Sequence, residues 1–225
     1  MPDDVGPLVT VRGEATAEVE PELAQLSVTV TARDRHRDRV VRDLDERAQA
    51  VDAVLGAHQA EIERVDTEAL RLSPQFATNK PRERVAGYEG TVRRTVLLHD
   101  FTGLGDLLVQ LSGIDLASVV GPWWSLRPDS PAHREVRVAA VHDAVRRARE
   151  YAEALGATLI GLVEVADAAL LSEAATSLPP AVPVAAQAFR GAAAPETFTF
   201  DITPTRQLLQ ATVEARFRAS PPILT

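Results

Sequence analysis

The chain has 225 residues, of which 45% are hydrophobic and 25% are charged, so it is long enough to bury a core as one large domain or two small lobes. The net charge is −8 and the basic residues are spread along the chain, which argues against nucleic acid as a partner because phosphate binding needs a concentrated basic face. The chain contains no cysteine, which excludes disulfides, thiol catalysis and thiolate metal sites.

Two strands are predicted at the start of the chain, over residues 8–19 and 22–33, because apolar and polar residues alternate in both. The apolar residues occupy odd numbers in the first strand and even numbers in the second. Pro21 lies between the two strands, and a proline belongs at a turn, bulge or edge because it has no amide hydrogen to donate. We therefore expect adjacent strands whose inward-facing parity is reset by a bulge or tight turn at Pro21.

A long helix is predicted next, with Asp34 as its N-cap and Gly56 as its C-terminal cap. Its apolar residues recur at helical spacing and are expected to form one buried stripe: Val40, Val41, Leu44, Ala48, Val51, Val54 and Leu55. Strands near residues 65–73 and over residues 88–100 follow, separated by a polar loop.

The second half of the chain is predicted to alternate between helices and strands. A second long helix is expected to bury a stripe of Val138, Val141, Val145, Ala148, Ala152 and Leu155. The predicted elements are, in order, a short helix capped by Asp100, a strand within 115–126, the long helix 131–155, a strand over 158–165, an Ala/Pro-rich loop over 167–197 and a strand within 206–219.

The order of these elements predicts the fold class. Strands that follow one another directly, beside long helices, are typical of an α+β fold, here with layered mixed or antiparallel sheets and two long helices packed on them. We expect a single domain over residues 8–218 with two loosely similar lobes. Lobe one is expected to span about residues 8–74 plus the C-terminal strand, and lobe two about residues 85–166.

Several stretches together carry a resemblance to a known family. "VTVRGEATAEVEPELAQLSVTV" combines a strand, a Gly-Glu pair, an acidic-proline step and an alternating strand. "VDTEALRLSPQF", "VAGYEGTVRRTVLLHDFTGLGDLL" and "REVRVAAVHDAVRRAREYAEALGATLIGLVEV" follow in that order. In order and spacing, residues 8–218 resemble the SIMPL domain family, whose bacterial members are described as domains of unknown function, oxidative-stress-defence proteins or periplasmic immunogenic proteins. The resemblance implies an α+β fold and, in some members, large ring-like oligomers, and it supplies no agreed catalytic residues.

No catalytic or metal-binding motif stands out. Among the five histidines no pair has the i,i+4 spacing of a helical metal site, and His133 and His142 would lie on opposite faces of a helix. Gly103 and Gly105 follow a predicted strand as in a phosphate loop, but the third glycine position is Leu108 and no Lys-Ser/Thr pair follows. We therefore predict no catalytic residue, no metal and no cofactor.

Three aromatic residues are candidates for an interface. Trp123 and Trp124 are adjacent in a predicted strand, so their side chains face opposite sides, and only one of them needs to lie in the core. The other then faces a helix layer, a groove or a partner, and Phe189 lies in the Ala/Pro-rich loop. By contrast, charges of alternating sign over residues 33–47 favour an ordinary solvated helix face.

The leading hypothesis is a non-enzymatic SIMPL-like assembly or binding module linked to stress response, with a homo-oligomer, including a ring, and a protein partner as expected associations. One alternative is a hydrolase or small-molecule-binding protein with a cleft between the lobes. No window approaches 18 consecutive apolar residues, so no transmembrane segment is predicted. If Met1 is the native start we expect a cytoplasmic protein, because no signal-peptide pattern follows it; an exported envelope protein with its signal removed is the other alternative.

Overall fold

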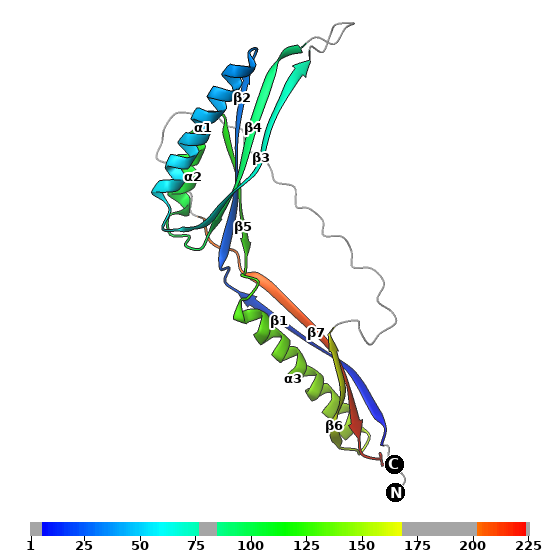
Figure 1. Cartoon of the computed structure of the whole chain (residues 1–225). Coiled ribbons are helices and arrows are strands. Elements are labelled where there is room, and N and C mark those ends of the chain that lie inside the picture. Colours follow the sequence, from blue (N-terminus) through cyan, green and yellow to red (C-terminus); the bar gives the residue numbers. More distant parts are fainter. Residues whose placement is uncertain (1–5, 77–84, 168–201, 224–225) are drawn as a thin grey trace. The chain divides into compact units, whose positions relative to one another are not determined.

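The computed structural model describes residues 6–76, 85–167 and 202–223 (Figure 1). Within these residues, strands and helices follow one another in the predicted order, and both sheets are antiparallel, so the α+β class is confirmed. The elements are β1 (Leu8–Val19), β2 (Leu23–Asp34), α1 (Arg37–Ala57), β3 (Ile62–Phe76), β4 (Val85–Leu98), α2 (Leu104–Ser112), β5 (Ala117–Ser125), α3 (Pro131–Ala154), β6 (Leu159–Asp167) and β7 (Gln207–Ala219). Phe189 and most of the expected 167–197 loop lie outside the described residues.

The chain divides into two compact units. Unit 1 comprises Met1–Glu20, Pro128–Pro183 and Arg206–Thr225 and contains β1, α3, β6 and β7. Unit 2 comprises Pro21–Arg127 and Val184–Thr205 and contains the remaining strands and helices. This division differs from the expected lobes, because the first expected lobe is split between the two units at β1 and β2. The cause is the pairing of β1 with β7, which joins the two ends of the chain in one sheet.

The first two strands are not neighbours in a sheet, so the expectation of adjacent strands is wrong. β1 pairs with β7, whereas β2 lies between β4 and β5 in the other sheet. The change of parity at Pro21 therefore has a different origin from a bulge within one sheet. The chain leaves one hydrophobic core and enters another at this proline, and each strand buries the parity that faces its own core.

Unit 2 is a sheet with helices on one face. Its strand order is β3-β4-β2-β5, and α1 and α2 supply the helix layer (Figure 1). The even-numbered residues of β2 are buried against this layer, while the intervening residues, including Thr29 and Thr31, lie on the other face. The core is formed by apolar side chains from both layers, among them Leu26, Val28, Val96, Val40, Leu44, Val51, Leu104, Leu107 and Leu111.

Two aspartates predicted to cap helices instead hold the turns before them. Asp34 is the last residue of β2, and its carboxylate accepts a hydrogen bond from the backbone N–H of His36, the N-cap of α1, at 2.7 Å. Asp100 accepts a hydrogen bond from the backbone N–H of Thr102 at 2.9 Å, and Gly103 is the N-cap of α2. Asp34 and Asp100 therefore lie two and three residues before the observed N-caps, and their carboxylates stabilise the turns that lead into the helices.

Unit 1 has one helix over a sheet of strand order β1-β7-β6. α3 packs mainly on β1 and β7 (Figure 1). The approach is close at Gly13, where an added Cβ would lie 2.1 Å from the backbone oxygen of Ala140 and 2.6 Å from the backbone nitrogen of Ala144. The helix face against the sheet is correspondingly small, with buried Val136, Ala140, Ala144, Ala148 and Ala152.

The predicted stripe of α3 is correct at Ala148 and Ala152, which are buried, and at Val145, which is half-buried against the core. Val138, Val141 and Leu155 are 40–45% exposed, because the sheet-facing side of the helix is the row of alanines at four-residue spacing. Only small side chains fit at the distance that Gly13 permits, so the longer valines lie beside the contact.

The close approach at Gly13 predicts a strong effect of a single methyl group. Gly13→Ala should lower the free energy of unfolding by about 1–3 kcal/mol, because the new Cβ collides with helix backbone that can move only by lifting α3. Urea unfolding monitored by circular dichroism measures the change. Gly161→Ala in β6 is the matched control, since nothing lies within 4 Å of a Cβ there. Equal stabilities of the two variants would contradict the assigned helix–sheet contact.

Candidate functional site

The two tryptophans of β5 lie on opposite faces of the unit 2 sheet, as their adjacency predicted. Trp124 packs against the core, with its ring in an edge-to-face arrangement with Phe101 at a centroid distance of 4.9 Å. Trp123 is 46% exposed. The interface role expected for these residues stays a prediction.

Neither the histidines nor the glycine pair considered in the sequence forms a metal or phosphate site among the described residues. Among the described residues, no group of three or more His, Asp or Glu side chains is arranged to hold a metal ion. His58 follows α1 as its C-cap, and its Nδ1 lies 2.9 Å from a carboxylate oxygen of Glu61. The same carboxylate lies beside Gly103, so the glycine pair that resembled a phosphate loop meets a negative charge. This arrangement disfavours an anion at that position.

Exposed apolar residues gather instead on β6, at the edge of the unit 1 sheet. Ile160, Leu162, Val163 and Val165 are each between 47% and 62% exposed. Leu162 and Val165 stand opposite Phe217 and Ala215, which are buried under α3. Because directly opposed residues share a face of a sheet, Leu162 and Val165 lie on the helix side. They remain exposed there because α3 covers β1 and β7.

The exposed valines of α3 continue this apolar region. Val141 and Val165 line the same groove of about 250 Å³, at which Ala140 and Val213 form part of the floor. Val138 lies one turn before Val141 on the helix. We call the following set the α3–β6 surface: Val138 and Val141 of α3, with Leu162 and Val165 of β6.

The opposite face of the unit 1 sheet is polar and carries cross-strand ion pairs. Arg12 stands opposite Glu214 in the register, and their side chains are 2.8 Å apart. Arg216 of β7 likewise pairs with Glu164 of β6 at 3.4 Å. The hydrogen bond to Glu214 raises the pKa of Arg12 above its usual value. On the polar face, these arginines and glutamates are therefore paired with one another. On the α3–β6 surface, by contrast, branched aliphatic side chains are exposed to water.

Sequence reasoning missed this surface for a specific reason. The segment 159–165 reads as a strand without polar–apolar alternation, which is also typical of a strand buried on both faces. Only the strand order shows that β6 is an edge strand with one neighbour. The valines of α3 were recognised as a stripe but assigned to the core.

The geometry places the chain in the class of two-layer α+β proteins, and sequence comparison identifies the family. The chain matches the SIMPL family, described as a protein of unknown function (DUF541), over residues 9–217. Since the match covers most of the sequence, the chain belongs to this family. No curated protein matches the chain. Across the part of the chain that the structure describes, no helix has the length and apolar character needed to cross a membrane.

The link between α3 and β1 predicts a pH dependence. The carboxylate of Asp143 accepts a hydrogen bond from the backbone N–H of Glu14 at 3.0 Å and forms ion pairs with Arg146 and Arg147. The Glu14 hydrogen bond, followed by the two guanidinium groups, lowers the pKa of Asp143. A lowered folded-state pKa stabilises the fold above the unfolded-state pKa, near 3.9 for aspartate, and this stabilisation is lost as the pH falls further through the folded-state pKa.

Asp143→Asn should therefore lower the free energy of unfolding at pH 7 by about 1 kcal/mol. The difference from the wild type should shrink below about pH 4, where the wild-type carboxylate becomes protonated. Urea unfolding at several pH values measures it, with Glu153→Gln on an exposed position of the same helix as the control. A difference that is constant with pH would contradict the assigned role of the Asp143 charge.

Proposed function

We propose that this SIMPL protein is a non-enzymatic assembly module, and that its α3–β6 surface binds the same surface of a second copy of the chain. The observation that carries the proposal is the exposure of four branched aliphatic side chains on adjoining elements, two of which, Val141 and Val165, line one groove of about 250 Å³. Contiguous exposed apolar groups of this kind mark interaction sites, whereas single exposed residues do not. The family match is compatible with this function and leaves it open.

The composition of the surface favours a second copy as the occupant. An apolar surface is complementary to itself, which is the requirement for a two-fold symmetric contact. The groove is bordered by one basic residue, Arg137, and one acidic residue, Asp167. Two facing copies therefore bring both signs of charge to the rim, and like-charge repulsion does not dominate. β6 contains neither lysine nor proline, two residues that commonly block association at an edge strand.

The chemistry of the surface supports binding over catalysis. Aliphatic side chains supply burial energy on contact and no proton transfer or nucleophile. The alternative of a small-molecule-binding protein has its own support in a separate pocket of unit 2. The expected link to stress response stays a prediction.

The proposal is tested by the solution mass, measured by size-exclusion chromatography with light scattering. The wild type should show a multiple of the chain mass of 24.3 kDa. Leu162→Glu should shift it towards 24.3 kDa by weakening association at least about tenfold, because each copy would bury an unpaired charge in the contact. Leu70→Glu, on an exposed leucine of β3 in unit 2, makes the same chemical change elsewhere and should leave the mass unchanged.

Thermal unfolding of the three proteins separates association from folding. A wild type of 24.3 kDa at all concentrations would overturn the proposal. So would equal dissociation by Leu162→Glu and Leu70→Glu, because the α3–β6 surface would then have no special role. A monomer whose melting temperature falls only with Leu162→Glu would mean that another part of the same chain covers the surface, which also excludes the second copy.

A further inference from the structure

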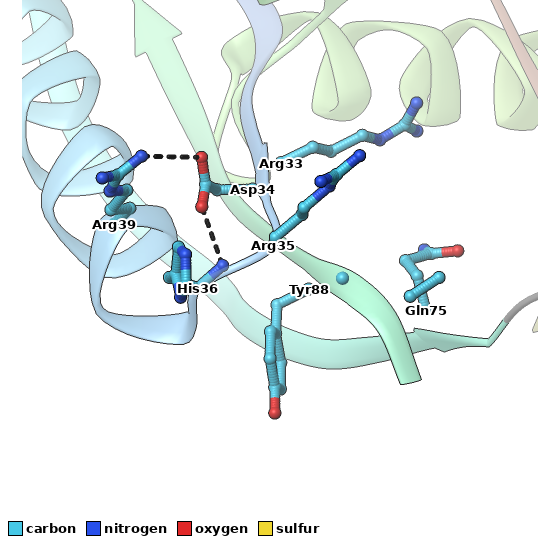
Figure 2. Close-up of a pocket in the computed structure, with 9 residues that line it drawn as sticks. Arg33, Asp34, Arg35, His36, Arg39, Gln75 and Tyr88 are labelled. Carbon is cyan, nitrogen blue, oxygen red and sulfur yellow. Dashed lines mark hydrogen bonds and ion pairs between the residues drawn. The ribbon is translucent and has the colours of Figure 1, made fainter. Parts of the chain in front are cut away.

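A basic pocket lies in unit 2, where β2 ends and α1 begins. Its volume is about 580 Å³. Figure 2 shows the lining side chains, in which Arg33 and Arg35 extend to the same side of the backbone. Arg39 from the first turns of α1 and Tyr88 from β4 also line the pocket. Three arginines of one short stretch of chain thus line the pocket, and in Figure 2 the guanidinium of Arg39 lies beside Asp34, apart from those of Arg33 and Arg35.

The three arginines differ in how their charges are compensated. Arg33 donates through Nε to the carboxylate of Glu89 at 2.7 Å. Arg39 reaches the carboxylate of Asp34 only at 4.0 Å, the outer limit of an ion pair (Figure 2). Within the described part of the chain, the Arg35 side chain is exposed and forms neither a hydrogen bond nor an ion pair. One guanidinium is therefore free and a second is weakly held.

The acidic groups near the pocket do not neutralise it. The hydrogen bond from the His36 backbone, followed by the nearby Arg39, lowers the pKa of Asp34, so this carboxylate is ionised at neutral pH. Even so, among the described residues the lining contains one carboxylate, Asp34, against three arginines. The whole chain carries a net charge of −8, so the local excess of positive charge at the pocket is opposite in sign to the net charge of the chain.

We propose that this pocket binds a small molecule through an oxyanion group, either phosphoryl or carboxylate. Guanidinium groups bind such oxygens through paired, charge-assisted hydrogen bonds, and Arg35 and Arg39 have donors available for them. Tyr88 presents an aromatic ring and Gly87 presents backbone at the wall, so the site has room for more than a bare ion. The inference is independent of the assembly proposed for unit 1.

A small ligand fits the charge distribution better than a nucleic acid. Nucleic-acid binding needs basic groups along an extended face. On the neighbouring strands, part of the basic charge is paired, as in Arg64 with Asp66 at 2.7 Å and Arg33 with Glu89, whereas Arg71 and Arg93 have no ion pair among the described residues. The net charge of −8 and the limited size of the pocket, about 580 Å³, therefore favour a small ligand over an extended polyanion.

Isothermal titration calorimetry of the full chain with sodium pyrophosphate, and separately with sodium citrate, tests the proposal. The ionic strength is kept low and matched, because salt screens exposed charges. Saturable binding of at least one anion is expected. Arg35→Ala should weaken it about tenfold, the effect of losing a charge-assisted hydrogen bond. Arg42→Ala removes the same charge from an exposed position of α1 that does not line the pocket, and should have little effect.

The two probes also distinguish the ligand chemistry. Binding of pyrophosphate alone supports a phosphoryl ligand, binding of citrate alone supports a carboxylate ligand, and binding of both supports the shared oxyanion site. Because the Arg35 side chain is exposed and forms no hydrogen bond or ion pair with another described residue, Arg35→Ala should keep the wild-type melting temperature. The absence of saturable heat with both anions would overturn the proposal. Equal weakening by Arg35→Ala and Arg42→Ala would overturn it too, since only general charge attraction would then remain.

Discussion

The missing side chain at Gly13 is the constraint on which the surface of unit 1 depends. Because β1 has no Cβ at this point, the backbone of α3 lies directly against the strand. That distance admits only small residues, so α3 turns its alanines to the sheet and leaves Val138 and Val141 at the side. A helix fixed over β1 and β7 cannot also cover β6, so the aliphatic residues of this edge strand remain exposed. One packing contact thus determines both halves of the α3–β6 surface.

Unit 2 covers its sheet with helices in a different way from unit 1. Two helices cover its sheet. The buried face of α2 consists of leucines, whereas the buried face of α3 in unit 1 consists mainly of alanines. Its core is filled by apolar side chains from both layers, the outer sheet face carries threonines and charged pairs, and single apolar residues such as Leu70 and Trp123 remain exposed. Unit 2 also leaves charge without a partner: Arg35 lies where β2 leads into α1, and its side chain has no ion pair among the described residues. The candidate site of unit 1 is therefore an exposed aliphatic surface, and that of unit 2 is an unpaired positive charge.

The sequence predicted local structure well because local structure is encoded by nearby residues. Alternation along β1 and β2 and the helical spacing in α1 gave the correct elements in the correct order. The pairing of β1 with β7 joins residues about two hundred positions apart, and no local pattern encodes that contact. The change of parity at Pro21 was visible, but a bulge within one sheet and a passage between two cores produce the same pattern.

The candidate sites were harder to predict than the fold, for two different reasons. α3 has two apolar rows, one of alanines and one of valines, and hydrophobicity favours the valines as the core face. The close backbone contact at Gly13 is what places the alanines, and not the valines, against the sheet. The arginines of residues 33–39 alternate with acids, which is typical of a solvated helix face. The end of β2 falls within this stretch, so its charges are divided between a strand and a helix, and the pairing expected along one helix is broken.

The two proposed contacts respond differently to their surroundings because they depend on different forces. Burial of the α3–β6 surface releases water from aliphatic groups, and salt that screens the repulsion between two chains of net charge −8 favours it further. Binding of an oxyanion near Arg35 is an attraction between exposed charges, which the same salt weakens. Raising the salt concentration therefore strengthens the first contact and weakens the second. Association of copies and occupancy of the pocket can accordingly be varied separately in the same protein, although both surfaces belong to one chain.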